Sequence, residues 1–162
     1  MPHETFKAAA HLVVSGKTRR FSRLEFILAH MGGSTLALVP RVAGLSSYMG
    51  APLSEDEILS EFRRYWWDAA LSGGCAARIV ELWGLGDRIF WGSDFPGASR
   101  TDNVIWMANQ DLSHGAVSLD TIRWFDCDLE RAYQADLSKL EDVRRRNVLQ
   151  LFNSRGIKLP VN

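Results

Sequence analysis

His30, Asp68 and Asp94 each stand at the end of a short, largely apolar run of the sequence. An imidazole can move protons near neutral pH, and a carboxylate can bind a divalent cation or act as a base, provided that both are held rigidly. In parallel α/β folds such groups gather at the carboxyl ends of the strands. The three residues therefore predict a catalytic or metal-binding site at one edge of a parallel sheet.

The residues around His30 and Asp94 support this prediction but have structural alternatives. Gly32-Gly33 would let the backbone approach a ligand and would open a helix whose N-terminus favours an anion such as a carboxylate. A histidine before two glycines often forms only a turn, and Ser93-Asp94 after a strand often only caps a helix. Their occurrence at successive strand ends favours the site.

Aromatic residues flank both acidic candidates. Asp68 follows Trp66 and Trp67, and two consecutive aromatic residues do not show which face of the strand points inward. Asp68 therefore either acts in the site or only supports the pocket. Trp66 and Phe95 are candidate pocket aromatics, with packing in the core as the alternative.

Other familiar catalytic patterns are missing. His3 and His11 lie eight residues apart, which is not the i, i+4 spacing of a helical zinc pair, so surface or capping roles are expected for them and for His114. Gly92-Ser93-Asp94-Phe95 does not match the GxSxG motif of a nucleophile elbow.

Composition narrows the function further. The chain has 162 residues, 46% of them apolar, enough for one sizeable core, and 19 basic residues balance 19 acidic ones. This balance disfavours binding to nucleic acid or to anionic lipid. Cys75 and Cys127 form no CxxC pattern, and no stretch is long and apolar enough to cross a membrane. We expect a soluble, cytoplasmic protein with two free thiols.

The elements that would position the candidate residues alternate along the chain. Apolar residues at helical spacing predict a first helix, and Gly16 would end it. Further helices are expected to start near Ser34, Ser54 and Ser72, and three helical patterns follow between about 103 and 152. Strands are expected over Leu24–Ala29, Arg64–Asp68 and Asp87–Gly92. This order predicts an α/β fold with a parallel sheet.

Three of these elements carry more detailed predictions. The nearly continuous apolar run Leu24–Ala29 is typical of a strand covered on both faces. Pro40 predicts a kink or a break in the helix that starts near Ser34. Ser54 and Glu57 predict a capping box.

Five segments together resemble the amidohydrolase-related family, in particular aminocarboxymuconate-semialdehyde decarboxylase and the dihydroxybenzoate (γ-resorcylate) decarboxylases. They are Pro2-His3-Glu4-Thr5, Phe26-Ile27-Leu28-Ala29-His30-Met31-Gly32-Gly33, Trp67-Asp68-Ala69-Ala70, Arg88-Ile89-Phe90-Trp91-Gly92-Ser93-Asp94-Phe95-Pro96 and Arg146-Asn147-Val148-Leu149-Gln150-Leu151-Phe152. The resemblance implies a TIM (β/α)8 barrel in which His30 ends the sixth strand and Asp94 follows the eighth. It also implies a catalytic role for His30 and for Asp94, with Asp94 as a ligand of zinc or, in some members, manganese.

The same resemblance implies an incomplete barrel. The family's first-strand metal motif, His-x-His or Glu-x-His, and its fifth-strand histidine have no counterpart in residues 1–162. A full barrel takes about 250 residues, and a catalytic zinc usually has three protein ligands. We therefore expect a single partial domain, with strands six to eight and the C-terminal helices.

Two functions remain open at this point. The first is a metal-dependent enzyme, a non-oxidative decarboxylase (carboxy-lyase) or hydrolase of a cyclic or aromatic carboxylate. The second is an inactive, truncated half-barrel that only packs, dimerises or binds. Two open sheet edges would favour association into a homo-oligomer in either case. A His-x-His motif upstream in the same reading frame would discriminate between the two.

Overall fold

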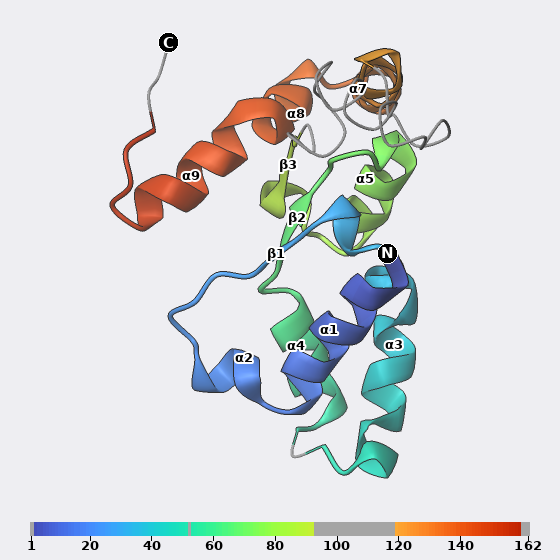
Figure 1. Ribbon diagram of the computed structural model, residues 1–162, viewed down its shortest axis with the longest axis vertical. Coiled ribbons are helices and arrows are strands. Elements are labelled where there is room, and N and C mark those ends of the chain that lie inside the picture. The colour runs from blue at the N-terminus through green and yellow to red at the C-terminus, as the bar shows by residue number, and fades with distance from the viewer. Residues whose placement is uncertain (1, 52, 93–118, 160–162) are drawn as a thin grey trace, which may run out of the picture.

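The computed structural model describes residues 2–51, 53–92 and 119–159. At its centre lies a parallel sheet of three short strands in the order β1-β2-β3 (Figure 1). The strands are β1 (Ile27–Leu28), β2 (Trp66–Asp68) and β3 (Ile89–Phe90). Ile27 pairs with Trp66, and Trp67 pairs with Ile89. The carboxyl ends of the three strands therefore share one edge of the sheet, as the sequence predicted.

Helices precede, connect and follow the strands. The first half of the chain contains α1 (Pro2–Val14), α2 (Lys17–Arg20), α3 (Thr35–Leu45) and α4 (Glu55–Phe62). The second half contains α5 (Gly73–Leu82), α7 (Leu119–Tyr133), α8 (Leu137–Glu141) and α9 (Asn147–Ser154). Short helical turns complete the order: η1 (His30–Gly32), η2 (Ser46–Met49), η3 (Gly86–Arg88) and η4 (Asp142–Arg146), the last a π-helical turn. The predicted alternation of helices and strands is confirmed.

Local signals in the sequence fix several helix boundaries. The predicted capping box is present: Ser54 Oγ accepts from the Glu57 amide at 3.4 Å, and the Glu57 carboxylate accepts from the Ser54 amide at 2.8 Å. Gly16 follows α1 with a φ of 69°, a left-handed conformation that suits glycine. α3 runs through Pro40 to Leu45, so the helix does not break there.

β1 is shorter and less covered than the sequence predicted. Of the apolar run Leu24–Ala29, only Ile27 and Leu28 pair with β2. Leu28 is 7% exposed, whereas Ile27 is 48% and Leu24 55% exposed. The prediction that this strand is covered on both faces was therefore wrong, because described helices pack on Leu28 but leave Ile27 open.

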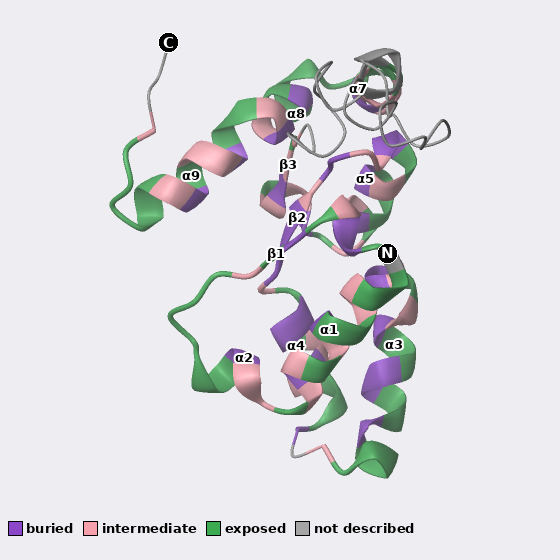
Figure 2. Ribbon diagram, in the orientation of Figure 1, coloured by how far each residue is buried: buried purple, intermediate pink, exposed green. Residues whose placement is uncertain are grey.

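The main core lies between the sheet and the helices, where the buried residues of the helices turn toward the strands (Figure 2). Trp67 is fully buried there, and its ring meets that of Tyr65 edge to face at 6.4 Å. The Tyr65 hydroxyl donates to the Ala9 carbonyl of α1 at 2.9 Å. The buried members of this core come from every layer: Val13, Leu28, Val39, Ile58, Tyr65, Trp67, Val80, Ile89, Leu129 and Val143.

A polar network joins β2 to the end of α9, which lies across the sheet from α3 (Figure 1). The Arg88 guanidinium stacks 5.0 Å from the centre of the Trp66 ring, and Trp66 Nε1 donates to Glu25 at 3.0 Å. The other Glu25 oxygen pairs with Arg155, which follows α9. These contacts attach the C-terminal helix to the start of β1.

The outer edge of β3 points its peptide groups away from the sheet. Phe90 faces β2, because its carbonyl accepts from the Ala69 amide at 2.9 Å. Backbone groups alternate in direction along a strand, so Ile89 and Trp91 point the opposite way. A further strand would have to pair with these groups.

The C-terminal helices already occupy that edge. The Trp91 amide donates to the Val143 carbonyl of η4 at 2.8 Å. The Asn147 amide donates to the carbonyls of Ile89 at 2.7 Å and Gly86 at 3.0 Å. We call the Val143 carbonyl and the Asn147 side chain the β3 clamp. The expectation of an open edge on this side of the sheet was therefore wrong.

Candidate functional site

β1 ends in an unusual turn that carries His30. His30, Met31, Gly32 and Gly33 have φ values of 54°, 52°, 67° and 58°, a left-handed run that non-glycine residues rarely adopt. A Cβ atom on Gly32 would lie 2.7 Å from the Trp67 ring, so only glycine fits at this position. The Thr35 hydroxyl closes the turn by donating to the Gly32 carbonyl at 2.5 Å. The turn thus holds His30 firmly against the core.

The half-buried His30 ring has one nitrogen bound to the backbone. Its Nδ1 lies 2.8 Å from the Ala70 carbonyl, beyond the end of β2. A carbonyl oxygen only accepts hydrogen bonds, so Nδ1 carries the proton and the neutral ring keeps its lone pair on Nε2. Nε2 is therefore the atom that could accept a proton or bind a cation.

The loop after β2 is built around the Ala70 carbonyl. Asp68 Oδ1 accepts from the Ala70 amide at 2.9 Å, and the Ser72 hydroxyl donates to the Ala70 carbonyl at 3.0 Å. Leu71, between Ala70 and Ser72, has a φ of 51°. Asp68, the candidate at the end of β2, is therefore a half-buried side chain that shapes this loop.

The end of β3 meets the end of β2 at Gly92. A Cβ atom on Gly92 would overlap the Asp68 carboxylate, so the two strand ends are in direct contact. Asp94 and Phe95 follow within three positions but lie outside the described residues. The structure thus brings His30, Asp68 and the residue two positions before Asp94 to one edge of the sheet.

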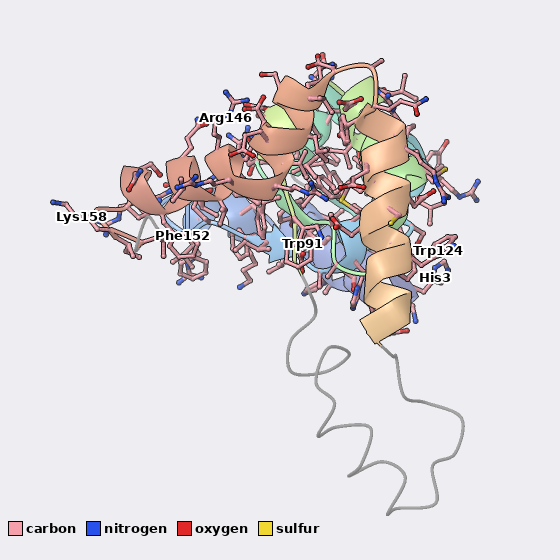
Figure 3. All side chains as sticks on the ribbon, turned by 90° about the horizontal axis from the view of Figure 1, so that it is seen from above. His3, Trp91, Trp124, Arg146, Phe152 and Lys158 are labelled. Carbon is pink, nitrogen blue, oxygen red and sulfur yellow. The ribbon has the colours of Figure 1, made fainter. Side chains whose placement is uncertain are left out.

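Two aromatic residues other than Trp66 line this edge, and Phe95 lies outside the described residues. A narrow hollow there is lined by Trp91 and Phe125, together with the small or apolar Ala69, Leu71, Gly73, Gly92 and Leu129. Figure 3 labels Trp91, which lies between α7 and the C-terminal helices. Trp66 is 6% exposed and lies between Arg88 and Glu25, away from this hollow.

The remaining histidines add little to the site. His3, in the first turn of α1, is exposed, and its Nδ1 lies 2.9 Å from Ser34 Oγ at the start of α3. His3 is thus a surface residue, one of the two roles expected of it, and its contact is with a side chain rather than with a helix-end backbone group. His11 is exposed on α1, and His114 lies outside the described residues.

A metal ion would need more ligands than this edge provides. Within residues 2–51, 53–92 and 119–159, no three histidine, cysteine, aspartate or glutamate side chains gather closely enough to hold one. A catalytic zinc takes three protein ligands, so these residues do not fit a complete zinc site by themselves. Asp94, the ligand that the resemblance implies, is not among them.

The groups that hold His30 could not be recognised from residue types and spacing. Ala70 acts through its main chain, which any residue type could supply. Ser72 was expected only to mark the start of the next helix, before Gly73-Gly74. Asp68 was a candidate because of its position at a strand end, whereas its contact with Gly92 depends on the pairing of β2 with β3.

Comparison with known proteins places the chain in a family. The sequence model of the family described as Amidohydrolase matches residues 1–137. The chain is 34% identical over 105 residues to the 6-methylsalicylic acid decarboxylase acuB of Aspergillus aculeatus, a match that covers 61% of the chain and 32% of that protein. It is 31% identical over 111 residues to the 6-methylsalicylic acid decarboxylase of Penicillium expansum, covering 67% of the chain and 34% of that protein. The chain thus spans about a third of the length of these relatives.

Solved structures show the same partial coverage. The 5-carboxyvanillate decarboxylase LigW of Sphingomonas paucimobilis aligns with a TM-score of 0.62 at 18% identity, over 90% of this chain and 38% of that one. The IDCase of Metarhizium anisopliae in its apo form aligns with a TM-score of 0.67 at 16% identity, over 96% of this chain and 40% of that one. The predicted fold class, α/β and the C-terminal part of a TIM barrel, is confirmed. None of the described helices has the length and apolar character needed to cross a bilayer. Because the family model matches residues 1–137, most of its length, the chain belongs to the amidohydrolase family.

Proposed function

We propose that this chain carries the His30 and Asp94 part of the active site of a metal-dependent, non-oxidative decarboxylase of aromatic carboxylates. The observation that supports it most directly is the His30 ring, whose Nδ1 is tied to the Ala70 carbonyl 2.8 Å away while Nε2 keeps its lone pair. The names of the relatives favour decarboxylation over hydrolysis, because they are 6-methylsalicylic acid decarboxylases.

In the proposed reaction the bond between the ring carbon and the carboxylate carbon breaks, and carbon dioxide leaves. The electron pair remains on the ring carbon, which takes up one proton in its place. His30 is suited to relay that proton, because its ring is rigidly held: Nε2, which carries the lone pair, would first take up a proton from solvent and then pass it to the ring carbon. Asp94 would assist in moving the proton and would be this chain's ligand to zinc or manganese. The hydrolase alternative would use the same two residues.

The test is turnover of 6-methylsalicylic acid by the full chain, followed as loss of substrate and release of carbon dioxide. His30→Gln and Asp94→Ala should each abolish turnover, and Asp94→Ala should also abolish bound metal, measured by elemental mass spectrometry. Ser154→Ala is the matched control, since Ser154 donates only to the Leu151 carbonyl on α9. Turnover retained in both site variants would refute the proposal.

A second candidate function is favoured by the β3 clamp. Because Trp91 and Ile89 already bond to Val143 and Asn147, no other strand can pair there unless α9 moves. The chain would then be an inactive half-barrel of residues 1–162 that acts by packing or self-association. Chain without bound metal and without turnover, but folded and self-associating, would support this alternative. In both cases we propose a cytoplasmic location, where the exposed Cys75 and Cys127 would stay reduced.

A further inference from the structure

We infer that Ser72 and Asp68 are positioning residues for His30, and that they act by fixing the Ala70 carbonyl that selects the ring's tautomer. This inference rests on the proposed function for its consequence in catalysis. It concerns atoms at and just after the end of β2 that act on the ring through the Ala70 carbonyl. Its geometric basis is three hydrogen bonds that converge on Ala70.

The Ala70 carbonyl accepts two hydrogen bonds at once. His30 Nδ1 lies 2.8 Å from it and Ser72 Oγ lies 3.0 Å from it. An sp² oxygen has two lone pairs, so the two donors do not compete. Ser72 therefore fixes the direction of the carbonyl from one side while His30 uses the other.

Asp68 holds the opposite side of the same residue. Its Oδ1 accepts from the Ala70 amide at 2.9 Å, and its carboxylate is itself confined by contact with Gly92. The Ser72 amide donates to the Ala69 carbonyl at 3.1 Å, which closes the loop. The peptide groups on both sides of Ala70 are thus fixed by neighbours only two residues away.

The backbone of Leu71 completes the arrangement. Its φ of 51° places it in the left-handed region, which is unfavourable for a non-glycine residue. Such a conformation persists only where surrounding contacts determine it. Here the surrounding contacts are those of Asp68 and Ser72, and the result is a carbonyl aimed at His30.

The choice of tautomer matters for the ring's reactivity. With Nδ1–H directed at a carbonyl, Nε2 is the only nitrogen that can take up a proton or a cation. Were Ala70 to turn away, the proton could move to Nε2, and the reactive nitrogen would then face the β2 loop.

The tautomer can be measured directly by long-range ¹H–¹⁵N correlation spectra of the full chain, without substrate or added metal. His30→Gln assigns the His30 signals among those of the four histidines. We expect His30 to be protonated at Nδ1 in the unaltered chain. Ser72→Ala and Asp68→Ala should each give a mixture of both tautomers. Ser72→Thr and Asp68→Asn keep the hydroxyl and the acceptor oxygen, so they should restore the single tautomer.

Two results would overturn the inference: an unaltered chain protonated at Nε2 of His30, or Ala variants at both positions that keep a single Nδ1-protonated form. If Asp68→Ala does not fold, Ser72→Ala and the unaltered chain still decide. Ser154→Ala serves as the control for removal of a hydroxyl that donates to a carbonyl elsewhere. A chain without turnover but with the expected tautomers would refute the proposed function and leave this inference standing.

Discussion

Asn147 is 4% exposed, and it bonds to a strand that lies far from it in the sequence. Its amide donates to the carbonyls of Gly86 and Ile89. A buried carbonyl that loses its donor keeps its desolvation cost without compensation. This single side chain therefore links the C-terminal helix to β3 more strongly than its size suggests.

Asn147→Ala should lower the free energy of unfolding by about 2 kcal/mol, because the buried Ile89 carbonyl and the part-buried Gly86 carbonyl lose their donor. Urea titration followed by circular dichroism measures it. Gln150→Ala, an exposed position on the same helix, is the matched control and should change stability by less than about 0.5 kcal/mol. Equal stability of the two variants would show that the amide is not bonded as described.

The buried phenol of Tyr65 should make the free energy of unfolding depend on pH in the alkaline range. Burial raises the pKa of its phenol well above the ordinary value, and the nearby Glu61 carboxylate adds to the effect. A tyrosine in the unfolded chain ionises near about pH 10, whereas the folded chain keeps the proton to higher pH. The contribution is therefore complete below about pH 10 and is lost as the pH rises through the raised pKa.

Urea midpoints measured between pH 8 and pH 11 should fall steeply in the unaltered chain at the top of this range. Tyr65→Phe should flatten that fall, although it lowers stability at neutral pH by removing the bond to the Ala9 carbonyl. Tyr48→Phe, at a position 87% exposed, should leave the profile unchanged. The same alkaline slope in Tyr65→Phe would contradict the assignment to this residue.

The helices α5 and α7 approach each other closely at Gly74. The Gly74 amide donates to Asp128 at 2.7 Å, so an aspartate from α7 satisfies the N-terminus of α5. A Cβ atom on Gly74 would overlap the Ala132 side chain and lie 2.6 Å from the Asp128 carbonyl. The two helices can cross at this distance only because no side chain separates them.

Gly74→Ala should therefore push α7 away from α5 and lower the unfolding free energy by at least about 2 kcal/mol, within the range for overpacked sites. Gly44→Ala is the matched control, since nothing lies within 4 Å of its Cβ position on α3. There the substitution should stabilise the chain by about 0.5 to 1 kcal/mol, as in other exposed helices. Thermal unfolding of both variants gives the comparison, and a neutral Gly74→Ala would argue against the close crossing.

The sequence predicted the order of the elements better than their extent. The alternation of helices and strands followed from apolar spacing and turn residues, and the capping box at Ser54 followed from residue types alone. The length of β1 could not be predicted in this way. The whole apolar run Leu24–Ala29 is typical of a buried strand, yet Ile27 within it is 48% exposed. Apolar character says that a residue prefers to be buried, but the neighbouring elements decide whether it is.

The candidate site divides in the same way. Strand-end positions identified His30 and Asp68, since parallel strands must share an edge. The Ala70 carbonyl and the Ser72 hydroxyl escaped prediction, because their role depends on the left-handed backbone at Leu71. The β3 clamp escaped it as well, since Asn147 and Ile89 are 58 residues apart and no periodicity connects them.

Taken as one body, the described chain is a three-stranded part of a barrel whose two edges differ. On the β1 side, Phe26 faces β2 because its carbonyl accepts from the Trp66 amide, so the peptide groups of Ile27 point outward. Ile27 is also 48% exposed there. An uncovered edge with an apolar side chain favours pairing with another chain.

Ile27→Lys should shift the chain toward monomer in sedimentation equilibrium, because a charged edge residue opposes strand pairing between copies. Ile79→Lys is the matched control, since Ile79 is 41% exposed on α5, away from the edge. It should leave the association constant unchanged. An unaltered chain that remains monomeric at all concentrations would refute association through this edge.

The β3 clamp should limit the number of copies that can associate through their strand edges. Among the described strands, β1 alone offers an unoccupied edge, so two copies joined through β1 about a two-fold axis would have no further edge to offer. Growth would end at a closed pair. Loss of the β3 clamp would leave each copy with two different unpaired strand edges, those of β1 and β3. Copies could then pair head to tail without limit. By keeping the β3 edge occupied, Asn147 would limit self-association to a dimer and prevent growth into a filament.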